Sequence, residues 1–292
     1  MTLTGTDLLA SPTPLPSNPY LYAEDVSHLN GQLFDSDSIP KATVGQQESE
    51  AELEQYLLNW SDLPLEVPFV FPDMTTQCLY GSLDAILISE GPRMLYLKGF
   101  VTEAERNHLM AISEPVYDQS GVYNMEDNTP KTDSDFRRSE SGSPPRDEVV
   151  KCIEQRARLV QPWRPGMGLE AVTVQRYSPG GFFKQHWDSF QTAPGPDRKS
   201  TINVFLDGNC TGGGTHFPDL PLPNDPTLCD ILDCESGLEG TVFRPIAGNA
   251  IFWENVRPDG TNYDEMLHAG LPVIEGTKVG MNMWTWGFPD VV

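Results

Sequence analysis

The sequence predicts a mainly β protein, a sandwich or barrel with helices packed against one face. Two helix-like segments come first, near residues 102–113 and 147–160, and strand-like runs follow them from residue 169 onward. Apolar and polar residues alternate in these runs, which is the period of a strand with one buried face. Glycine and proline separate one run from the next. Helices followed by many short strands with tight turns favour this layered β architecture.

The 292-residue chain divides into three expected regions. Residues 1–50 are rich in proline, serine, aspartate and glycine, which is typical of a disordered or loosely packed acidic tail. Residues 51–92 form a leader segment that packs on the core, with a short helix at 52–60 and extended chain at 63–72. Residues 93–292 form the main folded domain.

The first part of the main domain supplies one strand and both helices. Residues 94–100 (MLYLKGF) are strand-like, and Thr102 and Glu105 then have the spacing of a capping box that begins a helix. Residues 118–146 are polar and predict a loop. The second helix has one apolar side, formed by Val150, Ile153, Ala157 and Val160.

The second part of the domain supplies the remaining strands. Glycine-rich residues 212–214 predict a bulge or turn between them. The predicted strands are 170–177, 182–190, 200–207, two within 241–255 around a turn at 247–249, and one at 276–288.

The composition argues against several classes of function. The formal net charge is −23, so nucleic acid is a poor partner, because phosphate contacts need clustered lysine and arginine. No run of about 18 apolar residues exists, so we expect no membrane-spanning helix. The N-terminus lacks the basic and apolar parts of a secretory signal. We therefore expect a cytoplasmic protein whose five cysteines are thiols.

His186 and Asp188 lie two residues apart on a predicted strand, so their side chains point to the same face while Trp187 points away. Alone, such a pair is more often a buried hydrogen bond than two ligands of a metal. His268 precedes the final strand, and a barrel would bring it back beside His186. Two histidines and one carboxylate form the facial triad of non-haem iron(II) oxygenases.

Lys278 follows His268 by ten residues and begins an apolar strand. A lone lysine on a terminal strand is usually solvated. A lysine close to the interior of a barrel would instead need an anion, and a dicarboxylate cosubstrate would provide one.

Several longer motifs lie in a fixed order between residues 93 and 288. They include FRRSESG (136–142), VQRYSPGGFFKQHWD (174–188), GGGTHFP (212–218), RPIAGNAIFWEN (244–255) and HAGLPVIEGTKVGMNMW (268–284). In these motifs the chain resembles the prolyl 4-hydroxylase-like branch of the iron(II)/2-oxoglutarate dioxygenases. The resemblance implies a double-stranded β-helix, a jelly-roll or cupin-like barrel. It also implies iron(II) as the metal, 2-oxoglutarate and O2 as cosubstrates, and ascorbate as a candidate reductant.

The resemblance further implies a role for individual residues. His186, Asp188 and His268 would bind iron as the catalytic centre, and Lys278 would pair with the distal carboxylate of 2-oxoglutarate. The resemblance places Tyr177, Thr201 and Trp284 at the cosubstrate, and Arg198, Phe183 and Trp286 at the substrate. Each of these residues also has a plainer interpretation: the aromatic side chains pack in the core, the threonine favours a strand, and the arginine is solvated.

The chain departs from the family pattern on the substrate side. The family often has Gln at the position of Gly181, Tyr at Phe183, Glu at Gly214 and His at Trp286. Together with the missing secretory signal and the absence of a peptide-binding repeat domain, these differences favour a small-molecule metabolite as substrate. It would be hydroxylated or desaturated at an aliphatic carbon in a biosynthetic reaction that releases succinate and CO2. The alternatives are a prolyl 4-hydroxylase acting on peptidyl proline, and a jelly-roll binding module without catalysis.

Overall fold

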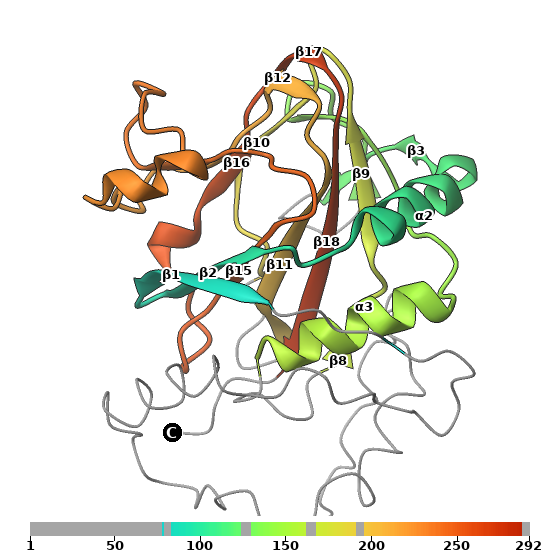
Figure 1. Ribbon diagram of the computed structural model, residues 1–292, viewed down its shortest axis with the longest axis horizontal. Coiled ribbons are helices and arrows are strands. Elements are labelled where there is room, and N and C mark those ends of the chain that lie inside the picture. The colour runs from blue at the N-terminus through green and yellow to red at the C-terminus, as the bar shows by residue number, and fades with distance from the viewer. Residues whose placement is uncertain (1–77, 79–82, 124–129, 162–167, 191–195, 288–292) are drawn as a thin grey trace, which may run out of the picture.

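Two antiparallel sheets face each other, and two helices cover the outer face of the larger sheet (Figure 1). The computed structural model describes residues 78, 83–123, 130–161, 168–190 and 196–287. The predicted tail, the helix at 52–60 and the extended segment at 63–72 lie outside these residues.

The larger sheet has the strand order β1-β2-β15-β11-β18-β9-β7-β3, and β8 pairs with β18. Its longest strands, β11 and β18, pair along their whole length at its centre. The bounds are β1 Asp84–Glu90, β2 Arg93–Lys98, β3 Asp118–Gln119, β7 Glu140–Gly142, β8 Gly168–Leu169, β9 Thr173–Tyr177, β11 Asp197–Asp207, β15 Ala250–Glu254 and β18 Lys278–Gly287.

The smaller sheet has the order β14-β13-β16-β10-β6, and two short ribbons, β12-β17 and β4-β5, complete the strands of the described part. The two opposed sheets form the double-stranded β-helix, so the predicted mainly β fold with flanking helices is confirmed. The bounds are β4 Val122–Tyr123, β5 Pro130–Lys131, β6 Arg137–Arg138, β10 Phe182–His186, β12 Cys210–Gly212, β13 Thr215–Phe217, β14 Thr241–Phe243, β16 His268–Gly270 and β17 Val273–Gly276.

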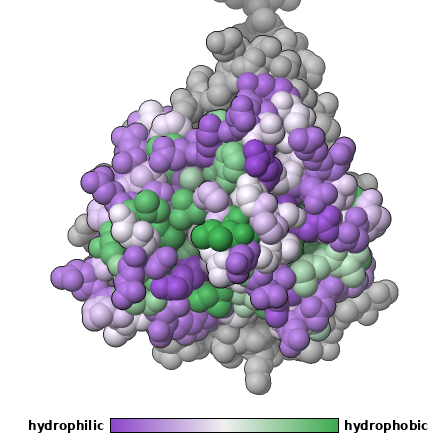
Figure 2. All heavy atoms as spheres, turned by 90° about the horizontal axis from the view of Figure 1, so that it is seen from above, coloured by the Kyte–Doolittle hydropathy of each residue, from purple (hydrophilic) through white to green (hydrophobic). Residues whose placement is uncertain are grey.

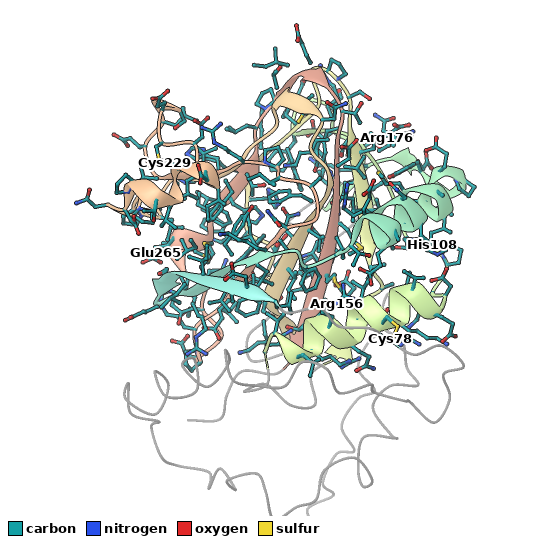
Figure 3. The ribbon with its side chains drawn as sticks, in the orientation of Figure 1. Cys78, His108, Arg156, Arg176, Cys229 and Glu265 are labelled. Atoms are coloured by element: carbon teal, nitrogen blue, oxygen red, sulfur yellow. A yellow bond between two sulfur atoms is a disulfide. The ribbon has the colours of Figure 1, made fainter. Side chains whose placement is uncertain are left out.

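The helices α2 (Glu103–Ser113) and α3 (Glu148–Leu159) begin as the sequence predicts. Both hydrogen bonds of the capping box between Thr102 and Glu105 are present. Asp147 caps α3 by accepting from the Val150 amide at 3.0 Å, and it also contacts His108 of α2 at 2.6 Å. This pair ties one helix to the start of the other (Figure 3). Among the described residues, no helix is long and apolar enough to cross a membrane.

The apolar core forms two layers on either side of the larger sheet. One layer joins the helices to the sheet and contains the four predicted residues of α3, with Val174, Ile202 and Met281 of the strands. The other layer lies between the sheets and contains Phe205, Trp253, Phe217 and Phe243. The larger sheet is therefore buried on both faces, which explains why β11 is buried along most of its length although its first half is polar.

Three segments differ from their predictions. The expected loop 118–146 contains the short strands β3 to β7, because residues such as Glu140 add to the edge of β9. The strand expected over 182–190 ends at His186. The two strands within 241–255 are present, but β14 and β15 belong to different sheets, so the turn at Gly248 is a crossover between the sheets rather than a hairpin.

The prediction of five free thiols is wrong. Cys78 forms a disulfide with Cys152 of α3 (Figure 3), and Cys229 forms one with Cys234. Cys210 is the free cysteine of the described part. The first pair joins residues 74 positions apart, so no local pattern in the sequence indicates it, whereas the second joins residues five positions apart. The first bond ties residue 78 to helix α3.

The end of the molecule that carries β12 and β17 has a hydrophobic patch within a hydrophilic surround (Figure 2). Ile274 of β17 is 69% exposed, the highest value among the large apolar side chains described. The hydrophilic surround agrees with the acidic composition of the chain.

Candidate metal centre

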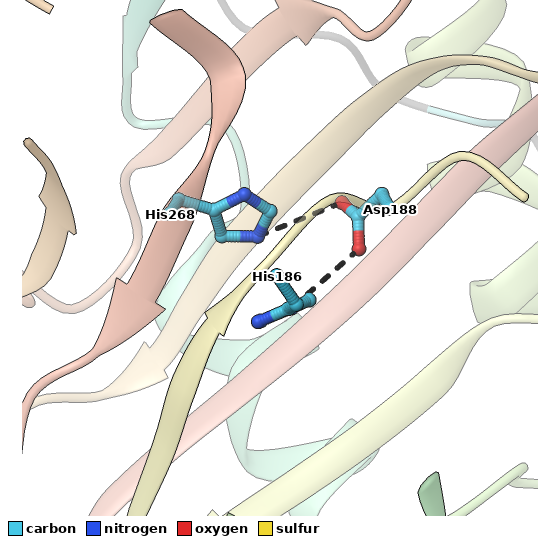
Figure 4. Close-up of side chains that lie close together, drawn as sticks. All are labelled: His186, Asp188 and His268. Atoms are coloured by element: carbon cyan, nitrogen blue, oxygen red, sulfur yellow. Dashed lines mark ion pairs between the residues drawn. The ribbon is translucent and has the colours of Figure 1, made fainter. Parts of the chain in front are cut away.

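The smaller sheet brings the two predicted histidines side by side. His186 is the last residue of β10, His268 is the first of β16, and the two lie directly opposite each other in the antiparallel register. Asp188 follows two residues after the end of β10. One ligand atom from each of the three side chains lies within 4.8 Å of the others (Figure 4).

The imidazole orientation suits metal binding. Nδ1 of His186 lies 2.7 Å from the backbone oxygen of Lys184, and Nδ1 of His268 lies 2.9 Å from that of Met266. A carbonyl oxygen only accepts, so each Nδ1 carries the proton and each Nε2 presents a lone pair. These Nε2 atoms are 3.9 Å and 3.8 Å from the Asp188 carboxylate.

The protonation states of the site also suit a cation. Burial, followed by the neighbouring His268, lowers the pKa of His186 to about 3, so this ring is neutral. Burial by itself would raise the pKa of Asp188, but His268 and His186 hold it below its usual value. A neutral imidazole and an ionised carboxylate are the forms that bind metals.

Two buried polar residues orient the Asp188 carboxylate. The Thr201 hydroxyl donates to Oδ2 of Asp188 at 2.7 Å. The Asn255 amide donates to Oγ1 of Thr201 at 3.0 Å and to the backbone oxygen of Arg198 at 3.2 Å. Thr201 and Asn255 are 0% and 2% exposed, so water cannot replace these bonds. Thr201, which the resemblance placed at the cosubstrate, therefore supports a ligand residue.

Lys278 lies inside the barrel with no carboxylate partner among the described residues. It begins β18 opposite Tyr177 of β9 and is 5% exposed. Its ammonium is 3.4 Å from Oγ1 of Thr215 and 5.7 and 5.6 Å from the ring centroids of Tyr177 and Phe205. Burial lowers the pKa of Lys278 to about 8. A buried ammonium without an anion fits a carboxylate-bearing cosubstrate.

Arg198 has a partner within the protein. Its guanidinium makes two hydrogen bonds to Glu170, at 2.8 and 2.6 Å, and lies 3.7 Å from the ring centroid of Trp284. Trp286 donates to the same glutamate at 2.7 Å. This network explains the positions of the Arg198 and Trp286 side chains by contacts within the protein, without a substrate.

Phe183 covers one side of the metal centre. Its ring is stacked on His186 with centroids 3.6 Å apart. On the opposite side, Phe217 stacks on His268 with centroids 5.3 Å apart. The two aromatic rings hold the imidazoles in place and limit the access of water.

Sequence reasoning assigned no role to Asn255, Thr215 or Phe217, although they stand in the motifs GGGTHFP and RPIAGNAIFWEN. Asn255 comes directly after the end of β15, where a polar residue is ordinary, and its contact with Thr201 spans 54 positions. The alternation of β13 (THF) was too short to show which of its side chains face the site. The motifs could have marked these residues as candidates, but not their contacts.

Comparison with known proteins agrees with this geometry. A family model described as the 2OG-Fe(II) oxygenase superfamily matches residues 172–286. Probable prolyl 4-hydroxylase 4 of Arabidopsis thaliana is 30% identical over 209 residues, which cover 68% of each chain. Prolyl 4-hydroxylase 2 of the same plant is 30% identical over 229 residues, which cover 72% of this chain and 75% of that protein.

A solved structure of a viral collagen prolyl hydroxylase from Paramecium Bursaria Chlorella virus-1, in complex with 2-oxoglutarate, has 24% identity and a TM-score of 0.47. The match covers 66% of this chain and 96% of the viral one. At this TM-score, the fold assignment rests on the sheet topology above. On the sequence relatives, the chain belongs to the prolyl 4-hydroxylase-like family of 2-oxoglutarate- and iron(II)-dependent oxygenases, and it is a dioxygenase that uses iron(II), 2-oxoglutarate and O2.

Proposed function

We propose that this chain is a prolyl 4-hydroxylase that acts on proline residues in peptides. The observation that carries the proposal is the convergence of three ligand atoms within 4.8 Å, in the same barrel as a buried lysine that lacks an anion. The Arabidopsis relatives named as prolyl 4-hydroxylases support the choice of substrate.

The expected small-molecule substrate is wrong. It rested on differences such as Phe183 and Trp286, but the relatives that match over two thirds of the chain are named as prolyl 4-hydroxylases. Trp286 binds Glu170 and Phe183 stacks on His186. Contacts within the protein therefore account for both side chains, and neither is evidence for a different substrate.

The residues of the site fit iron(II). Nε2 of His186, Nε2 of His268 and the carboxylate of Asp188 would hold the ion on one face, which leaves its other positions free. Thr201 and Asn255 would keep the carboxylate oriented during turnover.

Lys278 would bind the distal carboxylate of 2-oxoglutarate. Its ammonium is buried between Tyr177 and Phe205, where a charge-assisted hydrogen bond is strong because water does not compete. Tyr177 lies directly opposite Lys278 and would add its hydroxyl to the same carboxylate.

Iron(II), 2-oxoglutarate and O2, when bound, supply the oxidation, in which 2-oxoglutarate becomes succinate and CO2 and one oxygen atom enters a C–H bond of the substrate. The protein keeps the His186 imidazole neutral and the Asp188 carboxylate ionised. Phe183 and Phe217 shield the histidine rings from water.

The test uses the full-length protein with iron(II), ascorbate, 2-oxoglutarate and a set of proline-containing peptides. We expect a gain of one oxygen on proline by mass spectrometry, with one succinate released per hydroxyproline. His268→Ala, which removes one ligand, should abolish both products. If a metabolite extract stimulates turnover of 2-oxoglutarate and none of the peptides does, the result would argue against the proposal.

The two disulfides bear on the predicted cytoplasmic location. Disulfides persist in oxidising compartments and are rare in the cytoplasm, so Cys78–Cys152 and Cys229–Cys234 favour an oxidising compartment. Thiol trapping in intact cells followed by mass spectrometry tests this. Five alkylated cysteines would support the cytoplasm, and a single one would support the oxidising compartment.

A further inference from the structure

Three cations gather on the edge of the smaller sheet beside the metal centre. Arg137 and Arg138 form β6, which is the last strand of that sheet. They pair with Phe183 and Phe182 of β10, and Lys184 follows on β10, where its amide donates to the backbone oxygen of Phe136 at 2.9 Å. Arg138 and Lys184 are exposed and Arg137 is half-buried.

Ring contacts link these cations to the proposed ligand His186. The guanidinium carbon of Arg137 lies 4.5 Å from the ring centroid of Phe183, and that ring stacks on His186 at 3.6 Å. Arg138 lies over Phe182 at 5.6 Å. Arg137 therefore lies one aromatic ring away from the place where oxidation would occur. Arg138 and Phe182 point to the other face of the sheet, because successive side chains of a strand alternate, so Arg138 and Lys184 continue the positive edge away from the metal centre.

The charges of these side chains are not neutralised within the described part of the chain. Arg137 contacts neutral groups, the hydroxyl of Ser139 at 2.9 Å and the backbone oxygen of Gly121 at 3.3 Å. Elsewhere in the described part, eight lysines and arginines form ion pairs with carboxylates. None of these ion pairs involves Arg137, Arg138 or Lys184.

This lack of partners is unexpected in so acidic a chain. The sequence has 42 acidic residues against 19 basic ones, so carboxylates are abundant. Adjacent cations without described carboxylate partners favour anionic ligands over cationic ones.

We propose that the edge formed by Arg137, Arg138 and Lys184 binds an acidic segment of the substrate, with aspartate or glutamate close to the target proline. The inference rests on the proposed function, because it assigns the flanking residues of the same peptide. The ring of Phe183 would lie between Arg137 and the metal centre.

The experiment compares two synthetic peptides of equal length around one proline, one with flanking Asp and Glu and one with Asn and Gln in their place. We expect the acidic peptide to have a kcat/KM higher by roughly fivefold or more, since each exposed ion pair contributes a few-fold at most. The preference should shrink at high ionic strength because salt screens exposed charges.

Variants locate the preference on the protein. The double variant Arg138→Gln/Lys184→Gln should bring the ratio of the two kcat/KM values close to one. Lys98→Gln/Lys151→Gln removes two charges, one on β2 and one on α3, that each have a carboxylate partner, and it should leave the ratio unchanged. Equal kcat/KM values for the two peptides in the unmodified enzyme would contradict the proposed binding of an acidic segment. That result would leave the proposed prolyl hydroxylation intact. Failure to hydroxylate either peptide, or any other proline peptide, would overturn the proposed function itself.

Discussion

Replacing Thr201 by valine should weaken metal binding without unfolding the barrel. Valine has the size and branching of threonine but lacks the hydroxyl that donates to Asp188 at 2.7 Å. Thr201 is fully buried, so no water can take over the bond. The Asn255 amide, which donates to the same hydroxyl and to the backbone oxygen of Arg198, loses one of these two acceptors.

The magnitude follows from the charge on the acceptor. A hydrogen bond to an ionised group contributes about 2 kcal/mol, which corresponds to roughly 30-fold in an equilibrium constant. The bond fixes the carboxylate before the ion arrives, so its loss means that metal binding must itself order Asp188. We expect the Kd for iron(II) to rise roughly 10- to 30-fold, within the range measured for residues that support metal ligands.

Anaerobic titration of the metal-free protein with iron(II), and with cobalt(II) as an air-stable probe, measures this change directly. Thr201→Ser keeps the hydroxyl and should restore most of the affinity. Thr241→Val is the matched control, because Thr241 is equally buried and donates to the backbone oxygens of Leu220 and Pro221. If Thr201→Val binds metal as tightly as the unmodified protein, the proposed role of this hydroxyl is wrong.

Three further predictions concern the cosubstrate lysine and the disulfides. The Kd for 2-oxoglutarate should rise with pH above about 8, by up to tenfold per unit, because the Lys278 ammonium of the empty site loses its proton there; a flat profile between pH 7 and 9.5 would exclude this lysine as the anion partner. Lys278→Met should raise the Kd for 2-oxoglutarate roughly 100-fold and remove its pH dependence, while cobalt(II) affinity stays within a few-fold. Cys78→Ser/Cys152→Ser should lower the free energy of unfolding by about 4 kcal/mol and Cys229→Ser/Cys234→Ser by about 2 kcal/mol, since the bonds span 74 and 5 positions; equal losses in urea unfolding would contradict the chain-entropy explanation.

Prediction from the sequence succeeded where the pattern involved residues a few positions apart, or where the candidate metal ligands occur in a recognisable order along the chain. The capping box of α2 needs only Thr102 and Glu105, and both of its hydrogen bonds are present. The expected return of His268 to the strand of His186 agrees with the structure. The choice of a small molecule was wrong, in part because it was inferred from side chains such as Phe183 and Trp286, whose contacts lie within the protein.

The sequence by itself determined the fold class, the two helices and the identity of the candidate ligands, because strand alternation, helix caps and residue type act over a few positions. Only the tertiary structure decided which distant groups meet. It joined Cys78 to Cys152, paired Arg198 with Glu170, and brought the Asn255 amide to the Thr201 hydroxyl. It also left Arg137, Arg138 and Lys184 without a carboxylate partner in the described part of the chain. These contacts depend on how the two sheets pack around the core. Packing brings together residues that are far apart in the sequence, and no periodic pattern in the sequence indicates which of them will meet.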